Sequence, residues 1–171
     1  MLISGENLFL REFILSDAPF IVELLNTPGW IKFIGDRNVH SVEDAIKYLQ
    51  NGPLKTYSDS GYGFWCVCLN TTNEAVGMCG FIQRDYLPAP DLGFAFLTPY
   101  ISKGFGYESA LLSIELAKKK FNISSLVAIT DPVNARSIKL LNRLGFVDAG
   151  NVVPPNTEES LLLMKLALTN D

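Results

Sequence analysis

The 171-residue sequence has little of what metal-based and triad-based chemistry requires. It contains one histidine, His40, and three cysteines. This supply of ligands excludes a zinc finger or a histidine-rich metal cage, and a Ser-His-Asp triad would have to use His40. Charged residues make up only 19% of the chain and the formal net charge is -4, which argues against a dedicated nucleic-acid-binding face. We therefore expect neither a metal site nor a nucleic-acid partner.

Long hydrophobic runs are missing as well. None approaches the roughly 18 residues of a membrane span, and the opening MLISGENLFLREF lacks the basic segment and apolar core of a signal peptide. Cys66 and Cys68 lie on one face of a predicted strand, where small buried thiols are a simpler interpretation than a redox motif. These absences predict a cytoplasmic protein that does not associate with membranes.

The sequence does have enough apolar residues to build a substantial core, because 48% of it is hydrophobic. It shows no internal repeat, charge block or low-complexity stretch that would mark a boundary. We therefore expect residues 1–171 to form a single domain.

Hydrophobic periodicity and turn residues predict seven strands and four helices. The strands are expected at 8–13, 64–69, 75–83, 91–97, 125–130, 147–153 and 160–168, and the helices at 17–26, 41–50, 105–121 and 134–144. This order combines an antiparallel meander with one β-α-β crossover. The fold class is therefore α/β (α+β), with a mixed, mostly antiparallel central sheet of about seven strands flanked by about four helices.

The turn at residues 97–108 is the most informative for chemistry, because it leaves a strand and opens a helix. Gly104 and Gly106 let the backbone turn tightly and approach a ligand. The first N–H groups of a helix lack internal partners and lie at the positive end of its dipole, so such a turn can bind phosphate, and Lys103 adds a charge. Glycines that merely turn the chain are the alternative, since a short Gly-x-Gly pattern is a weak signal.

A second informative stretch, residues 131–137, opens the last helix. Asn134 there is either a helix N-cap or a ligand contact, and Ser137 lies in the first turn. A dinucleotide-binding motif does not fit, because six residues separate Leu97 from Gly104 and only one further strand-helix unit follows. A Walker A loop is absent.

Essentially the whole chain resembles a GNAT-superfamily N-acetyltransferase. The segments that carry the resemblance are LFLREF, FWCVCLNTTNEAVGMCGFIQRD, DLGFAFL, PYISKGFGYESA and NARSIKLLNRLGF. The pattern is most similar to the ribosomal-protein N-acetyltransferase branch, and GDRNVHSVEDA and GMCGFIQRD resemble an uncharacterised bacterial group within it. The resemblance implies a GNAT-like acyl-CoA N-acyltransferase fold and acetyl-coenzyme A as cosubstrate, without a metal.

The resemblance also implies where the cosubstrate lies, with its pyrophosphate on the backbone N–H groups of the turn and its pantetheine arm along the preceding strand. The residues so implied are Phe96, Leu97, Thr98, Ser102, Lys103, Gly104, Phe105, Gly106, Tyr107, Asn134 and Ser137. The chain departs from the family pattern at Ile101, where Gln or Arg is usual, and at Leu141, where a Tyr protonates the departing thiolate. Ser137 could take that role or only hydrogen-bond the sulfur.

The mechanism expected from the resemblance is direct attack of an amine on the thioester carbonyl in a ternary complex, with backbone N–H groups near Leu97 stabilising the oxyanion. Asp91 is the candidate general base, directly or through water, and joins Ser137 and Asn134 in the expected catalytic set. A solvated strand-end carboxylate is the alternative for Asp91. The aromatic residues in the regions where the family builds its acceptor pocket are Trp30, Phe33 and Tyr62, although each could equally be core.

The expected activity is therefore acetyl transfer to a primary amine, either a protein N-terminus or a small molecule. An acetyl-CoA-binding module or sensor without turnover is the alternative that Ile101 and Leu141 favour, and a nucleotide oxidoreductase would instead bind NAD. The acidic net charge favours a cationic acceptor. We expect the chain to act as a monomer or a homodimer.

Overall fold

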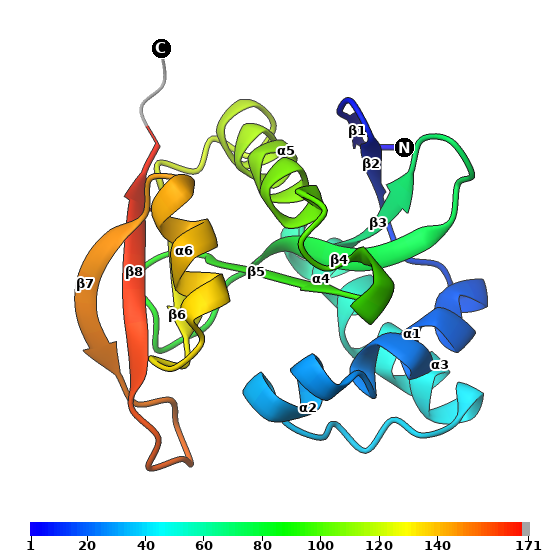
Figure 1. Ribbon diagram of the computed structural model, residues 1–171, viewed down its shortest axis with the longest axis horizontal. Coiled ribbons are helices and arrows are strands. Elements are labelled where there is room, and N and C mark those ends of the chain that lie inside the picture. The colour runs from blue at the N-terminus through cyan, green and yellow to red at the C-terminus, as the bar shows by residue number, and fades with distance from the viewer. Residues whose placement is uncertain (169–171) are drawn as a thin grey trace.

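The computed structural model describes residues 1–168, which form one open sheet with helices on both faces (Figure 1). The sheet has the strand order β1-β2-β3-β4-β5-β6-β8-β7. Its strands are β1 (Ile3–Ser4), β2 (Leu8–Arg11), β3 (Phe64–Leu69), β4 (Ala75–Ile82), β5 (Asp91–Phe96), β6 (Ser125–Thr130), β7 (Val147–Val152) and β8 (Leu161–Ala167). The α-helices are α1 (Ala18–Leu25), α2 (Pro28–Phe33), α3 (Val42–Asn51), α4 (Pro53–Ser60), α5 (Phe105–Lys119) and α6 (Ala135–Arg143), with short 3-10 turns η1 (Leu15–Asp17) and η2 (Thr98–Tyr100).

Neighbouring strands pair antiparallel everywhere in the described sheet except between β5 and β6, which run parallel. The predicted mixed, mostly antiparallel sheet is confirmed, with eight strands rather than seven. The additional strand is the two-residue β1, which is too short to leave an alternating pattern in the sequence.

The predicted helix count of four is too low, because α2 and α4 were both taken for loops. Each begins at a proline, Pro28 or Pro53, two or three residues beyond the end of a predicted helix, where proline is also a common stop signal. Proline is well tolerated in the first helical turn, where its missing N–H would have no partner. At α2, the Thr27 hydroxyl accepts a hydrogen bond from the Trp30 N–H at 3.4 Å, so a new helix starts with only Asn26 and Thr27 between it and the end of α1.

Alternation along the strands sends side chains to two separate cores. On β3, Trp65 and Val67 face the α5 side of the sheet, whereas Cys66 and Cys68 face the side covered by α1 to α3. The thiols of Cys66 and Cys68 are fully buried with their sulfurs 3.6 Å apart. The interpretation of these cysteines as buried residues on one strand face is confirmed.

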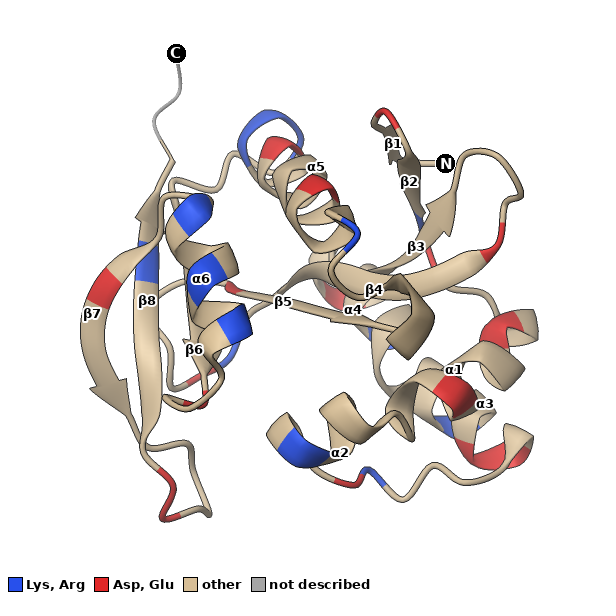
Figure 2. Cartoon of the chain, viewed as in Figure 1, with Lys and Arg blue, Asp and Glu red and all other residues tan. Residues whose placement is uncertain are grey.

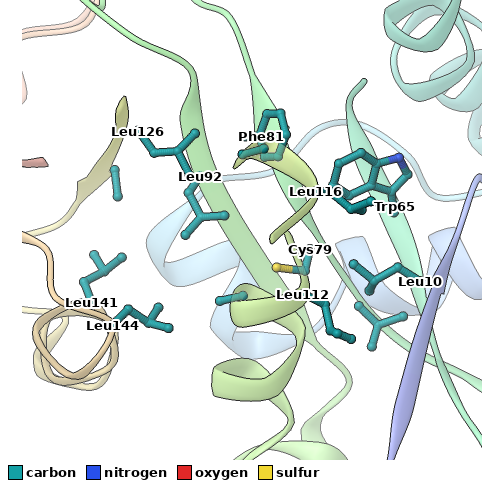
Figure 3. Packing of buried hydrophobic residues seen from close by; sticks show 14 of the residues in the cluster. Leu10, Trp65, Cys79, Phe81, Leu92, Leu112, Leu116, Leu126, Leu141 and Leu144 are labelled. Atoms are coloured by element: carbon teal, nitrogen blue, oxygen red, sulfur yellow. The ribbon is translucent and has the colours of Figure 1, made fainter. Parts of the chain in front are cut away.

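The larger core lies between the sheet and the helix pair α5 and α6 (Figure 3). Leu112 and Leu116 of α5 pack beside Trp65 and Phe81, and Leu141 of α6 and its C-cap residue Leu144 pack against the β6 side. These helix residues are spaced by three or four, so each helix presents one apolar stripe to the sheet. Because α5 follows β5 and α6 follows β6, packing of both helices on the same face places their first turns near the ends of these two strands. No helix within residues 1–168 is long and apolar enough to cross a bilayer.

Candidate active site

The parallel pair β5 and β6 separates almost as soon as it forms. Only Asp91 and Val127 are in register, with the Val127 N–H donating to the Pro90 carbonyl at 2.9 Å. The next amide on the same side of β6 belongs to Ile129, and it donates instead to Oδ1 of the Asp91 side chain at 3.3 Å. The carboxylate thus takes the place of a backbone acceptor at the point where the two strands diverge.

Beyond this point β5 has a free backbone edge toward β6. The N–H of Leu97 donates to the Val76 carbonyl of β4 at 3.0 Å, on the opposite side of the strand. Backbone groups alternate between the two sides of a strand, so the N–H groups of Phe94 and Phe96 point toward the gap. The expected pairing edge is present, but the N–H of Leu97 itself is already bonded and is not available for an oxyanion. The free donor nearest to it on this edge belongs to Phe96.

Asp91 is almost fully buried, with 4% of its surface exposed. Its Oδ2 accepts a hydrogen bond from Nε of Arg84 at 2.7 Å, in addition to the bond from Ile129 to Oδ1. Burial raises the pKa of Asp91, while the charge and hydrogen bond of Arg84 act in the opposite direction. The alternative of a solvated strand-end carboxylate is therefore wrong, because the side chain lies inside the sheet.

The turn from β5 into α5 presents unpaired backbone donors. Ser102 and Gly104 have positive φ angles of 64° and 86°, and a Cβ on Gly104 would meet no atom within 4 Å. Within the described chain, the backbone N–H groups of residues 103–106 have no protein acceptor, whereas that of Tyr107 donates to the Gly104 carbonyl at 3.1 Å. Of the backbone N–H groups of residues 103–107, the first four are thus free at the start of a 15-residue helix, and that of Tyr107 is bonded.

Two polar contacts hold this turn in place. The Tyr100 hydroxyl donates to Glu74 at 2.7 Å, which ties η2 to the start of β4. Glu108, in the first turn of α5, accepts from the backbone N–H groups of Asn7 and Leu8 at 2.7 and 3.1 Å. Glu108 is therefore bonded to the β1–β2 turn, and the free donors of α5 are presented by an anchored helix.

The start of α6 lies beyond the open end of β6. The Asn134 Oδ1 accepts from the Ser137 N–H at 3.1 Å, so Asn134 is the N-cap that the sequence allowed as one alternative. Within residues 1–168, the Ser137 hydroxyl has no hydrogen-bond partner, and the side chain is half-buried. Ser137 lies one turn before Leu141, which packs in the core with 1% of its surface exposed, so both are on the helix face directed at the sheet.

A hollow of about 450 Å³ lies on the other side of this region. It is lined by residues 31–35 at the end of α2, Asp131 and Pro132 after β6, and residues 159–161 at the start of β8. Phe33 is among its lining residues, whereas the side chain of Trp30 is buried in the core, with its indole N–H unpaired within the described residues. Tyr62 lies elsewhere, because its ring packs against Phe81 and Phe121 at centroid distances of 5.0 and 5.4 Å.

Sequence reasoning assigned no role in the site to three contributors to this region, although one of them, Asp131, stands in the informative stretch 131–137. Arg84, the partner of Asp91, stands seven residues before it with no motif to mark it. Glu159 reaches the hollow only because the loop between β7 and β8 returns to α2. Asp131 could have been found, since it directly follows β6 at the end of the strand where ligands of open sheets bind.

The described residues contain no group of three or more His, Cys, Asp or Glu side chains that could hold a metal ion. The site instead combines a strand edge, an open helix start and an adjoining hollow. This arrangement fits a long anionic ligand lying between β5 and β6, with a second reactant entering from the α2 side.

Comparison with known proteins agrees with this geometry. Residues 7–147 match the acetyltransferase (GNAT) domain family. The chain is 26% identical over 149 residues to the uncharacterized N-acetyltransferase p20 of Bacillus licheniformis, covering 85% of this chain and 82% of p20.

Solved structures share the fold at low sequence identity. An acetyltransferase of Salmonella typhimurium that modifies the N-terminal serine of ribosomal protein L7/L12 has a TM-score of 0.82 at 15% identity, covering 98% of this chain and 99% of that one. The microcin C7 self-immunity acetyltransferase MccE, in complex with acetyl-CoA and AMP, has a TM-score of 0.81 at 14% identity, covering 96% of this chain and 94% of that one.

Proposed function

The chain belongs to the GNAT acetyltransferase family, and on that premise we propose that it transfers an acetyl group from acetyl-coenzyme A to a primary amine. The observation that carries the proposal is the divergence of β5 and β6 beside the unpaired N–H groups of residues 103–106. The family uses acetyl-CoA, and the residues present fit it, because free amides suit a pyrophosphate and a free strand edge suits the amide-bearing pantetheine arm.

In this proposal the amine nitrogen bonds to the acetyl carbon while the bond from that carbon to sulfur breaks. The amine loses one proton and the departing thiolate gains one. Asp91 takes the amine proton through a chain of waters, because it lies five residues along β5 from Phe96, roughly 16 Å at the usual rise of a strand. Each of its oxygens already accepts one protein bond and retains a further lone pair for water. The Phe96 N–H faces the gap and is the proposed oxyanion donor, in place of Leu97.

The acceptor occupies the hollow beside Phe33 and Asp131. Its lining includes two acidic residues, Asp131 and Glu159, against one basic residue, Lys32, together with apolar residues such as Ile31, Phe33 and Leu161. Carboxylates favour a protonated amine on arrival, and the apolar surfaces suit the carbon frame around it. A peptide N-terminus and a small-molecule amine both have this chemistry. The structurally similar acetyltransferase of Salmonella typhimurium modifies the N-terminal serine of a ribosomal protein.

A ligand-stability measurement tests the cosubstrate. At a concentration one hundred times its Kd, acetyl-CoA or coenzyme A should raise the free energy of unfolding by about 2.7 kcal/mol, because only the folded state binds it. Thermal unfolding with acetyl-CoA, coenzyme A and NAD in parallel provides the measurement, with NAD as the negative control. No stabilisation by either coenzyme species would contradict the proposal.

Turnover separates the enzyme from a binding module. The buried Leu141 occupies the position where a family member carries its thiolate-protonating Tyr, and this favours an acetyl-CoA sensor as the second candidate. Release of free coenzyme A thiol should be followed over a panel of peptides, polyamines, aminoglycosides and amino acids. Stabilisation by acetyl-CoA without thiol release from any of them would support the sensor.

Replacement of Ser137 by alanine tests how the thiolate is neutralised. We expect Ser137→Ala to lower kcat by about ten- to a hundredfold, the value of one hydrogen bond to a charged group. The free energy of unfolding should stay within about 0.5 kcal/mol of wild type, because the backbone N–H of Ser137, not its hydroxyl, bonds the cap. An unchanged kcat, with product release shown not to limit the rate, would exclude Ser137 from this step.

A further inference from the structure

The hollow beside α2 is lined by residues of both charge signs. Lys32 is the one charged residue of α2, and it lines the hollow together with Asp131, which follows β6, and Glu159, which lies in the loop before β8. Figure 2 shows a basic band on α2 and an acidic band in the loop between β7 and β8. We call this hollow of about 450 Å³ the acceptor hollow.

The opposite charges of the acceptor hollow do not pair with one another. Within residues 1–168, Lys32 has no carboxylate within 4.0 Å, and neither Asp131 nor Glu159 has a basic group within that distance. Exposed lysines on other helices do reach a carboxylate one turn away, as Lys47 reaches Glu43 at 2.9 Å on α3. The acceptor hollow therefore keeps one basic and two acidic residues that have no ionic partner among the described residues.

Local contacts hold two of these charges in place. The Lys32 Nζ lies 5.0 Å from the centre of the Phe33 ring, a distance at which the ring attracts the ammonium group. Oδ1 of Asp131 accepts a hydrogen bond from the Val133 N–H at 2.9 Å. A ligand that pairs with both residues must carry a negative and a positive group, each about 2.8 Å from its partner. A zwitterion has this property, and its own length matches charges that stand too far apart to pair directly.

Resting on the proposed function, we propose that the amine acceptor is a free α-amino acid with an apolar side chain, and that Lys32 selects it by binding its carboxylate. Asp131 directly follows β6, which borders the proposed cosubstrate, so the amino group lies on the Asp131 side and the carboxylate on the α2 side. The lining residues Ile31, Phe33 and Leu161 supply apolar surface for the side chain. The transfer gives the N-acetyl amino acid and free coenzyme A.

Other amines match the acceptor hollow less well. A polyamine carries only positive groups, which Lys32 repels. A peptide N-terminus carries an uncharged amide where a free amino acid carries its carboxylate, so it offers Lys32 no ionic partner. The volume of the hollow also lies in the range of small-ligand sites, which extends from about 300 to 1,000 Å³. Lys32 is therefore the residue that distinguishes these three classes of acceptor.

The test compares apolar amino acids with their amides, which keep the amine and the side chain but lack the negative charge. Leucine, methionine and phenylalanine, each beside its amide, are assayed by thiol release from acetyl-CoA, and wild type should acetylate at least one of these amino acids. In Lys32→Gln the ratio of kcat/KM for the amino acid to kcat/KM for its amide should fall about fivefold, the upper end of what an ion pair with an exposed side chain contributes. The two amines differ in intrinsic reactivity, but this difference cancels when the ratio is compared between variants.

The matched control is Lys120→Gln. The Nζ of Lys120 lies 5.4 Å from the centre of the Phe121 ring, so this variant removes the same charge and the same kind of ring contact, but at the end of α5 and outside the lining of the acceptor hollow. Its ratio should equal that of wild type. An unchanged ratio in Lys32→Gln, or thiol release with other amines but with none of these amino acids, would overturn the inference and leave the proposed transfer standing. If no amine releases thiol, the proposed function fails and this inference fails with it.

Discussion

The Gly104→Glu variant is expected to lose at least about a hundredfold in affinity for coenzyme A. The residue lies at the start of α5 with a φ of 86°, and its Cβ would project into open space in front of the free amides. A carboxylate there would face the pyrophosphate, and two unit charges 4 Å apart repel by about 4 kcal/mol at an effective dielectric constant of 20. Titration calorimetry with coenzyme A measures the loss.

A second glycine provides the control for backbone strain. Gly150 of β7 also has a positive φ, 96°, and no atom within 4 Å of a built Cβ. Gly150→Glu therefore introduces the same charge and a similar conformational cost far from the turn. Both variants should lose similar stability, but only Gly104→Glu should lose coenzyme binding. Equal coenzyme affinity in the two variants would place the anion site elsewhere.

Replacement of Asp91 by alanine is expected to lower the free energy of unfolding by about 2–3 kcal/mol. The change removes an ion pair with Arg84 and leaves the Ile129 N–H without its acceptor. The loss stays below that of a fully buried pair, because a third of the Arg84 side chain is exposed and can be hydrated. Urea denaturation measures the effect, and Asp85→Ala, an exposed residue of the same loop, should change stability by less than about 0.5 kcal/mol.

Asparagine at the same position separates the structural function of Asp91 from its proposed catalytic one. Asp91→Asn keeps the volume and an acceptor for the Ile129 N–H, but an amide does not take a proton from an amine. We expect kcat to fall by about a hundredfold or more, with coenzyme affinity within about threefold of wild type. A wild-type kcat in this variant would leave Asp91 with only the function of holding the strands.

The regular elements were predictable where local pattern and tertiary environment agree. The strands at 64–69 and 125–130 match their predicted bounds, because their apolar, β-branched residues lie in a buried sheet. The helix at Ser41 begins as predicted, since Ser41 and Asp44 form the reciprocal capping bonds that their spacing indicates. The helices that begin at Pro28 and Pro53 were not predicted, because a proline in the sequence is compatible both with the end of one helix and with the first turn of the next.

The site was predictable only in its local part. Gly104 and the free amides belong to one continuous segment, so their geometry follows from sequence order. The buried pairing of Asp91 with Arg84, and the contact of Tyr62 with Phe121, depend on how distant segments pack. Without a motif for such contacts, the sequence could propose Asp91 as a base but could not show that it is enclosed by the sheet.

The divergence of β5 and β6 also bears on self-association. A sheet normally exposes unpaired backbone only at its two outer strands, which are sites of edge-to-edge aggregation. Here β1 is two residues long and β7 has an irregular register between Asp148 and Asn151, so both outer edges are poor templates. The edges of β5 and β6 that face each other are neither as short as β1 nor irregular in register like β7. A cosubstrate that lies between them would thus also cover the edges most able to pair with another chain.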